Sequence, residues 1–157
     1  MSTIQEHRGN LLAVTAGILV HGCNAQGVMR SGVAKDLRAK YPGAFDAYKR
    51  KYDQSGLKVG DVVYYEPPRT LGAPQFVIAN AITQKYYGRD PDVVYVSYDG
   101  LERCFEDIGK LARQTGMAVH FPLVGAGLAN GKWPEIAPRI ERALGPDIEK
   151  HLWIYVP

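Results

Sequence analysis

The stretch of residues 17–34 constrains the fold of this chain more than any other part of the sequence. Residues 18–23 are an apolar run, short enough for one strand that is buried on both faces. The chain then crosses a polar turn that holds Asn24 and Gln26, passes two glycines and enters a helical pattern at Val33. A strand, a glycine-bearing loop and a helix start, in that order, aim several backbone N–H groups at one point, with the positive end of the helix dipole behind them. The stretch therefore predicts a site for a phosphate or a diphosphate.

A second glycine-rich loop, residues 124–131, follows another apolar run at residues 118–123. Ligands of α/β sheets bind beyond the carboxyl ends of the strands, which is where both loops fall. One such loop is weak evidence. Two loops that each follow a buried strand make a phosphate-bearing, nucleotide-like ligand the leading hypothesis.

Strand and helix patterns alternate along the chain. They predict strands at residues 3–8, 18–23, 59–66, 75–82, 118–123 and 152–156, the first of them at or near an edge, and helices after Ser31, at about 44–52, between Ser97 and Gly116, and from Pro134 to Leu144. A chain of 157 residues is expected to form one domain, residues 1–157. The alternation predicts an α/β fold, a three-layer α/β/α sandwich with a mixed central sheet.

The formal net charge of +3 suits an anionic ligand, but it is too small for the dense basic face of a duplex-DNA binder. No apolar run approaches the length of about 18 residues that a membrane span needs, and no leader pattern is evident. We therefore expect a cytoplasmic monomer that binds neither a membrane nor a nucleic acid duplex. Cys23 and Cys104 are expected to be buried thiols. Because the two cysteines and four histidines show no metal-ligand spacing, neither a metal nor a cofactor is expected.

Polar residues near the ends of the apolar runs are the candidates for chemistry. Asn24 is placed either to bond a ribose hydroxyl or to tie its own loop together. His21 lies within an apolar strand, where a core histidine is the commoner outcome, but its closeness to Asn24 also fits a group that moves a proton near neutral pH. Asn80 lies near the end of another strand. Asp90, in the polar loop that follows, either pairs with Arg89 on the surface or acts as a base if the loop folds over the ligand.

Several common motifs are absent. The chain has no G-x-x-x-x-G-K-[ST] sequence for a P-loop and no G-x-S-x-G nucleophile turn. Gly125 and Gly127 begin a dinucleotide-binding pattern, but Asn130 stands where its third glycine is needed. The second loop thus fits a phosphate without matching either of these nucleotide-binding motifs.

Five segments together resemble the macro domain family, whose members bind ADP-ribose and its derivatives. They are residues 9–12 (GNLL), 21–27 (HGCNAQG), 31–34 (SGVA), 78–84 (IANAITQ) and 122–128 (PLVGAGL), in family order and over nearly the whole chain. The His-x-Cys-Asn form is most similar to the branch of ADP-ribose-1″-phosphate phosphatases, and it also resembles the branch that removes terminal ADP-ribose from proteins. The resemblance implies a macro domain fold and a small-molecule ligand, ADP-ribose or a derivative, either free or carried on an ADP-ribosylated protein.

The resemblance also implies a place for each ligand-binding residue. The turn at Gly9 and Asn10 would meet the adenine. Many members have an Asp at this turn, which accepts a hydrogen bond from the exocyclic amine of adenine, and the side-chain oxygen of Asn10 can accept the same bond without the charge. Residues 26–33 would wrap the diphosphate and the distal ribose, residues 124–130 would bind the phosphates through N–H groups, and Tyr155 would either stack on the adenine or pack in the core. The ligand-binding residues implied in this way are Gly9, Asn10, Leu11, Gln26, Gly27, Arg30, Ser31, Gly32, Val33, Gln84, Val124, Gly125, Ala126, Gly127, Leu128 and Tyr155.

Two departures from the family pattern affect the expected activity. Arg30 stands where the family commonly has a small residue, and it either contacts phosphate or points to solvent. The branch that cleaves terminal ADP-ribose from acidic side chains uses a Lys after the Ile-Thr pair and an Asp after the second loop. This chain has Gln84 and Ala129 at those positions, and Lys85 is one place off, on the opposite face of a continuing strand.

We therefore expect a metal-independent hydrolase that converts ADP-ribose-1″-phosphate to ADP-ribose and phosphate. Its catalytic residues would be His21, Asn24, Asn80 and Asp90, with His21 as general acid or base. The alternatives are a non-catalytic ADP-ribose-binding module and a hydrolase of O-acetyl-ADP-ribose or of protein-linked ADP-ribose.

Overall fold

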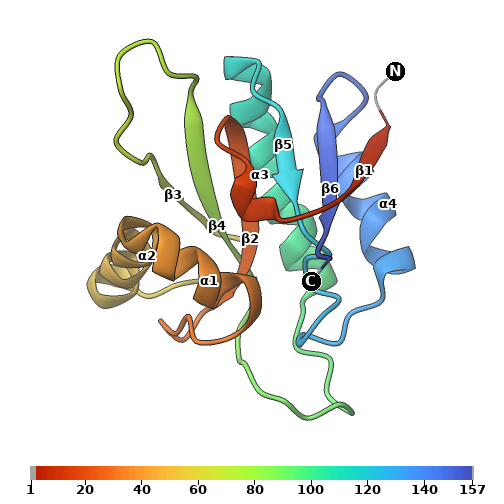
Figure 1. The fold of residues 1–157 in the computed structure, drawn as a ribbon. Coiled ribbons are helices and arrows are strands. Elements are labelled where there is room, and N and C mark those ends of the chain that lie inside the picture. Colours follow the sequence, from red (N-terminus) through yellow and green to blue (C-terminus); the bar gives the residue numbers. More distant parts are fainter. Residues whose placement is uncertain (1–2, 157) are drawn as a thin grey trace.

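Six strands form one mixed sheet in the computed structural model, which describes residues 3–156 (Figure 1). The strands are β1 (Ile4–Arg8), β2 (Gly17–Asn24), β3 (Val62–Tyr65), β4 (Phe76–Gln84), β5 (Val119–Phe121) and β6 (Lys150–Ile154), in the order β1-β6-β5-β2-β4-β3. All neighbouring pairs are parallel except β3 and β4, which are antiparallel. The expected mixed sheet and the edge position of the first strand are confirmed.

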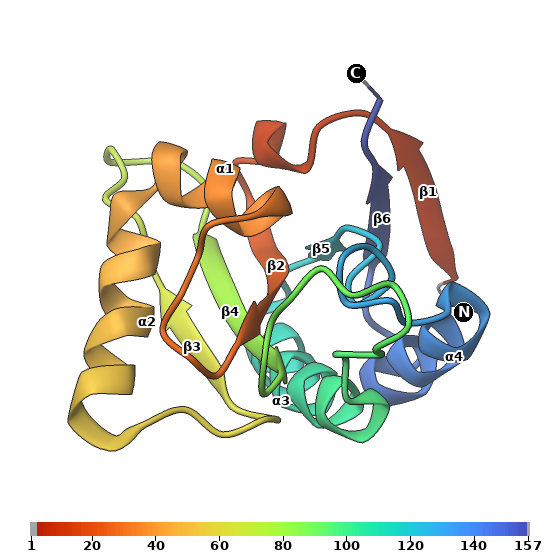
Figure 2. The same cartoon turned by 90° about the horizontal axis from the view of Figure 1, so that it is seen from below.

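Helices cover the two faces of this sheet. Helices α1 (Gly32–Lys40) and α2 (Pro42–Ser55) pack on one face, and α3 (Tyr98–Thr115) and α4 (Trp133–Leu144) pack on the other (Figures 1 and 2). A short 3₁₀ turn, η1 (Leu11–Ala13), follows β1. The arrangement is the three-layer α/β/α sandwich that the sequence pattern predicts. None of the described helices is long and apolar enough to cross a membrane.

Strand β2 is buried on both faces, which explains its unbroken apolar sequence. Ile18 and Val20 belong to the core beneath α3 and α4, while Leu19 belongs to the core beneath α1 and α2. Strand β4 beside it is buried in the same way from Ile78 to Ile82. The two parallel strands end together, and so they carry Asn24 and the last residues of β4 to one edge of the sheet.

Some strand boundaries differ from the sequence prediction for identifiable reasons. Strand β6 begins at Lys150, two residues earlier than predicted. A lysine is normally exposed, but Lys150 is only 1% exposed here. Its ammonium group donates to the carbonyl oxygens of Gly145 and Ile148 at 2.8 and 3.0 Å, which allows a residue type that is normally exposed to lie in the interior. Strand β3 begins at Val62 rather than at residue 59, because Gly60 turns the chain with a φ of 103°.

Candidate functional site

A pocket of about 790 Å³ opens at the carboxyl edge of the sheet, where the two glycine-bearing loops meet. Figure 2 shows three loops around this edge, residues 24–31 in orange, 85–95 in green and 122–132 in blue. The lining residues are 22–24, 28–34, 83–84, 87–89, 122–129, Trp153 and Tyr155. Both loops that the sequence singles out therefore contribute to one site.

The N-terminus of α1 forms one wall of the pocket, through residues 31–34. Ser31 precedes the helix, but its hydroxyl makes no capping hydrogen bond, so the N–H groups of the first turn keep their capacity to donate. Gly32 has a φ of 58°, a left-handed conformation that a residue with a side chain adopts only with strain. This wall presents N–H groups and a positive helix dipole to the pocket.

The second loop forms the facing wall and is held close to the core. Gly125 has a φ of 79°, and a Cβ atom there would lie 2.8 Å from Val96 Cγ2. A Cβ atom at Gly131 would lie 2.5 Å from the carbonyl oxygen of Gly125. Within the described chain, the amide N–H groups of Gly125, Gly127 and Leu128 donate to no protein acceptor. The loop therefore has amides available for a ligand and glycines where close packing requires them.

Two arginines are the charged residues in the pocket lining, and among the described residues no Asp, Glu, Lys or His belongs to it. Arg30 comes from the first loop and Arg89 from the loop after β4. The guanidinium of Arg89 lies 3.4 Å from the hydroxyl of Ser31, so the two loops meet across the pocket. The lining carries positive charge without an acidic partner, which favours an anionic ligand.

Asn24 lines the pocket and also braces the first loop. Its Oδ1 atom accepts the N–H of Gln26 at 2.9 Å, and its Nδ2 atom donates to the carbonyl oxygen of Val28 at 2.8 Å. The hydroxyl of Tyr48, from α2, lies 2.9 Å from Asn24 Oδ1 and accepts the N–H groups of Gly27 and Val28 at 3.1 and 3.2 Å. Burial raises the pKa of Tyr48, which keeps this hydroxyl neutral. Of the two interpretations of Asn24, the internal tie of the loop is the one that these contacts describe.

His21 and Asn80 lie in the core, outside the pocket lining, and neither has exposed surface. His21 Nε2 donates to Asn80 Oδ1, and Asn80 Nδ2 donates to the carbonyl oxygen of Ala44 at 3.1 Å. The pair thus joins β2 and β4 to the first turn of α2. Burial lowers the pKa of His21 to about 4, so the ring is neutral at pH 7. Cys23, rather than His21, lines the pocket, and its sulfur lies 3.6 Å from His21 Nε2. Burial raises the pKa of the Cys23 thiol.

Asp90 also lies outside the pocket lining. Its Oδ1 atom accepts the N–H of Asp92 at 2.9 Å, and its carbonyl oxygen accepts from Asn130 Nδ2 at 2.9 Å. The loop after β4 does reach over the pocket, but it does so through residues 87–89. Asp90 and Arg89 form no ion pair in the described structure, and the carboxylate of Asp90 shapes the loop instead.

The other expected residues divide into two groups. Gln26 Nε2 donates to the carbonyl oxygen of Lys85 at 2.9 Å, and Asn10 Oδ1 accepts the N–H of Leu12 and so caps the 3₁₀ turn. The expected ligand-binding residues that lie outside the lining are Gly9, Asn10, Leu11, Gln26 and Gly27, whereas those that line the pocket are Arg30, Ser31, Gly32, Val33, Gln84, Val124, Gly125, Ala126, Gly127, Leu128 and Tyr155.

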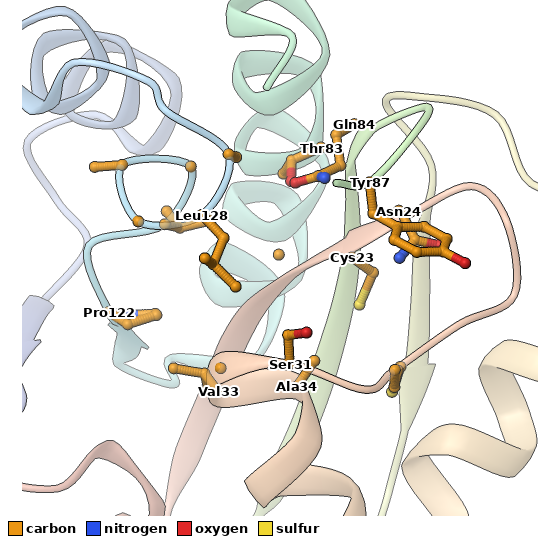
Figure 3. Close-up of a pocket in the computed structure, with 18 of the residues that line it drawn as sticks. Cys23, Asn24, Ser31, Val33, Ala34, Thr83, Gln84, Tyr87, Pro122 and Leu128 are labelled. Carbon is orange, nitrogen blue, oxygen red and sulfur yellow. The ribbon is translucent and has the colours of Figure 1, made fainter. Parts of the chain in front are cut away.

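Sequence reasoning missed two lining residues in particular, Thr83 and Trp153. Figure 3 shows Thr83 and Gln84 of β4 facing Ser31 across the pocket, although the sequence pattern assigns both to a loop. The indole N–H of Trp153 donates to His120 Nδ1 at 3.0 Å, which leaves the ring as an aromatic wall. Trp153 could have been found from the period of two along a strand, since it shares a face with Tyr155.

Comparison with known proteins identifies similar sequences over most of the chain. The family model of the Macro domain matches residues 20–140. A DNA ADP-ribosyl glycohydrolase of Thermus aquaticus is 29% identical over 150 residues, which are 96% of this chain and 40% of the relative. An ADP-ribose 1″-phosphate phosphatase of Scheffersomyces stipitis is 21% identical, over 89% of each chain. The chain thus spans about two fifths of the length of the glycohydrolase and most of the phosphatase.

Two solved structures share the fold over at least 98% of the chain. The macrodomain of Thermus aquaticus DarG superposes with a TM-score of 0.78 at 28% identity and covers 100% of both chains. A protein of unknown function from Bacteroides thetaiotaomicron superposes with a TM-score of 0.84 at 23% identity over 98% of both chains.

Proposed function

Because the chain belongs to the macro domain family, we propose that its pocket binds the ADP-ribose group, either free or attached to another molecule. One observation carries this proposal: the uncapped N-terminus of α1 faces the free amides of Gly125, Gly127 and Leu128 across a single pocket. A diphosphate between these walls would accept hydrogen bonds from both. Arg30 and Arg89 would balance its charge.

The remaining lining fits the two ends of such a ligand. Trp153 lies near the end of β6 and Tyr155 directly follows that strand, while Asn24 and Gln84 end β2 and β4. In the sheet order β6 is two positions from β2 and three positions from β4, which is about 10 and 14 Å at the usual strand spacing. An elongated ligand can therefore place an aromatic base against Trp153 and a second ribose near Gln84.

The first test is titration calorimetry with ADP-ribose, with ADP and ribose 5-phosphate as fragments. We expect saturable one-to-one binding of ADP-ribose and weaker binding of each fragment. The variant Arg89→Gln should bind more weakly, and raising the salt concentration should affect this variant less than the wild type. Absence of ADP-ribose binding by the folded wild-type protein would falsify the proposed ligand.

For the reaction, we propose hydrolysis of ADP-ribose-1″-phosphate. Guanidinium groups and free amides are donors suited to a terminal phosphate, and removing one such donor commonly lowers the rate about 10²–10³-fold. Gln84 and Ala129 stand where a Lys/Asp mechanism would need its two residues, and Lys85 is outside the pocket lining. The proposal keeps Asn24 near the distal ribose but assigns no proton transfer to His21, because a buried neutral ring behind Cys23 does not reach the ligand.

A second candidate, an ADP-ribose-binding module without turnover, is favoured by the absence of carboxylate, lysine and histidine side chains from the described lining. Phosphate release from ADP-ribose-1″-phosphate separates the two. We expect release by the wild type, a rate at least tenfold lower for Arg30→Gln, and unchanged chemistry for His21→Asn molecules that remain folded. Tight binding of ADP-ribose would identify the binding module instead if the protein releases neither phosphate from ADP-ribose-1″-phosphate nor ADP-ribose from a modified protein or oligonucleotide.

A further inference from the structure

Thr83 carries the one buried side-chain oxygen or nitrogen in the described structure that has no hydrogen-bond partner. The residue is 1% exposed and lines the pocket near the carboxyl end of β4 (Figure 3). An unpaired buried hydroxyl costs about 1–3 kcal/mol of stability. Other buried polar side chains of this chain, such as His21, Asn80 and Lys150, have partners, so the exception calls for a reason.

The surroundings of Thr83 keep its hydroxyl in one place. Its carbonyl oxygen accepts the N–H of Ser97 at 2.8 Å, and its β-branched side chain has few rotamers. On the neighbouring strand, a Cβ atom at Gly22 would lie 2.9 Å from Thr83 Oγ1 and 3.0 Å from Val124 Cγ2. The absence of a side chain at Gly22 therefore leaves room for the Thr83 hydroxyl. Val124 of the second loop lies beside the same space, and the free amides of this loop come directly after it.

We propose that Thr83 is a specificity-determining residue whose hydroxyl hydrogen-bonds to an oxygen of the ligand's phosphate or of the adjoining ribose. This inference rests on the proposed binding of ADP-ribose. The hydroxyl is unpaired within the protein and gains its partner when the ligand enters, so it contributes to affinity and not to the stability of the free protein. Gly22 is the matching element, because any larger residue would occupy the space of the hydroxyl.

The test uses two substitutions in the full chain. Thr83→Val keeps the shape and removes the hydroxyl, while Thr83→Ser keeps the hydroxyl. Calorimetry with ADP-ribose measures affinity, and urea unfolding without ligand measures stability. We expect Thr83→Val to raise the Kd about tenfold or more while the free protein is as stable as the wild type or more stable. Thr83→Ser should bind within about threefold of the wild type. Thr115→Val, which removes a hydroxyl bonded to Leu111 on α3, should leave the Kd unchanged.

The other possible outcomes count either against the role of Thr83 or against the proposed ligand. Equal affinity of the wild type and Thr83→Val overturns the role of Thr83 and leaves the proposed ligand intact. Lower stability of Thr83→Val without ligand means that the hydroxyl has an internal partner in solution, which also overturns it. If the wild type itself does not bind ADP-ribose, the proposed function fails, independently of any Thr83 variant.

Discussion

His21 and Asn80 show how much of this site depends on single side chains whose partners are remote in sequence. The two residues are 59 positions apart, yet each satisfies the other inside the sheet. Hydropathy correctly indicates that residue 21 is in a buried strand, but it cannot indicate which neighbour a buried polar group will meet. The open choice between a core histidine and a reactive one is decided in space, by the register of β2 against β4.

The pair predicts a structural rather than a catalytic phenotype. Replacing Asn80 with Ala leaves the His21 N–H unpaired in the interior and removes the bond from Asn80 to the Ala44 carbonyl, and we expect the free energy of unfolding to fall by about 2–4 kcal/mol. The Kd for ADP-ribose of the folded protein should stay within about threefold. Urea unfolding and calorimetry measure the two quantities, with Gln54→Ala, an exposed amide on α2, as the neutral control. A fully stable Asn80→Ala protein that loses binding would contradict this assignment.

At the scale of elements, the two helices that begin after serines differ in one respect. Ser97 caps α3 with a hydrogen bond to the N–H of Gly100 at 3.0 Å, whereas Ser31 leaves the N-terminus of α1 uncapped. A capping side chain contributes typically about 1 kcal/mol to a helix. The uncapped end of α1 lines the pocket, so the missing cap coincides with the proposed phosphate site.

This contrast predicts opposite effects of one substitution. Ser31→Asp adds a carboxylate that can cap α1, so we expect stability to rise by about 0.5–1 kcal/mol. The same carboxylate would occupy the proposed phosphate site and repel the negatively charged ligand, so the Kd for ADP-ribose should rise at least tenfold. Ser97→Ala is the matched control, with lower stability and unchanged affinity. Thermal unfolding and calorimetry together test the pair, and tighter binding by Ser31→Asp would refute the site.

Most elements could be predicted from the sequence, because long amphipathic or apolar runs fix their type. The helix between Ser97 and Gly116 is an example, and Gly116 ends it in the left-handed conformation with a φ of 76°. The position of the loop after β4 could not be predicted. Its course over the pocket depends on Asn130, whose Nδ2 atom donates to the carbonyl oxygens of Asp90 and Val93 at 2.9 and 2.7 Å. No local pattern links an asparagine to a loop about 40 residues before it.

At the scale of the whole molecule, the buried His21 and the half-buried His120 link stability to pH. Burial is the main cause that lowers the pKa of both His21 and His120 to about 4. In the unfolded chain both rings titrate near pH 6.5. Between these values the unfolded state binds more protons than the folded state, so acid favours unfolding.

We therefore expect full stability above about pH 6.5 and a continuous loss as the pH falls toward 4. The slope from His21 alone is about 1.4 kcal/mol per pH unit at its steepest. Urea unfolding at pH 7, 5.5 and 4.5 measures the slope, and His120→Asn should flatten it in part. A constant free energy of unfolding from pH 7 to 5 would show that His21 is not buried neutral in solution.

The pairing of β1 with β6 has a consequence for how the protein is made. β1 lies at the edge of the sheet and has β6 as its neighbour, and His7 and His151 meet across 144 residues at 2.8 Å. A ribosome therefore delivers the first strand long before its partner exists. The closure of this edge requires one of the longest loops in the chain, which makes it a slow and entropically costly step. Until residue 154 has been synthesised, the nascent protein lacks the strand that fills the space between β5 and β1.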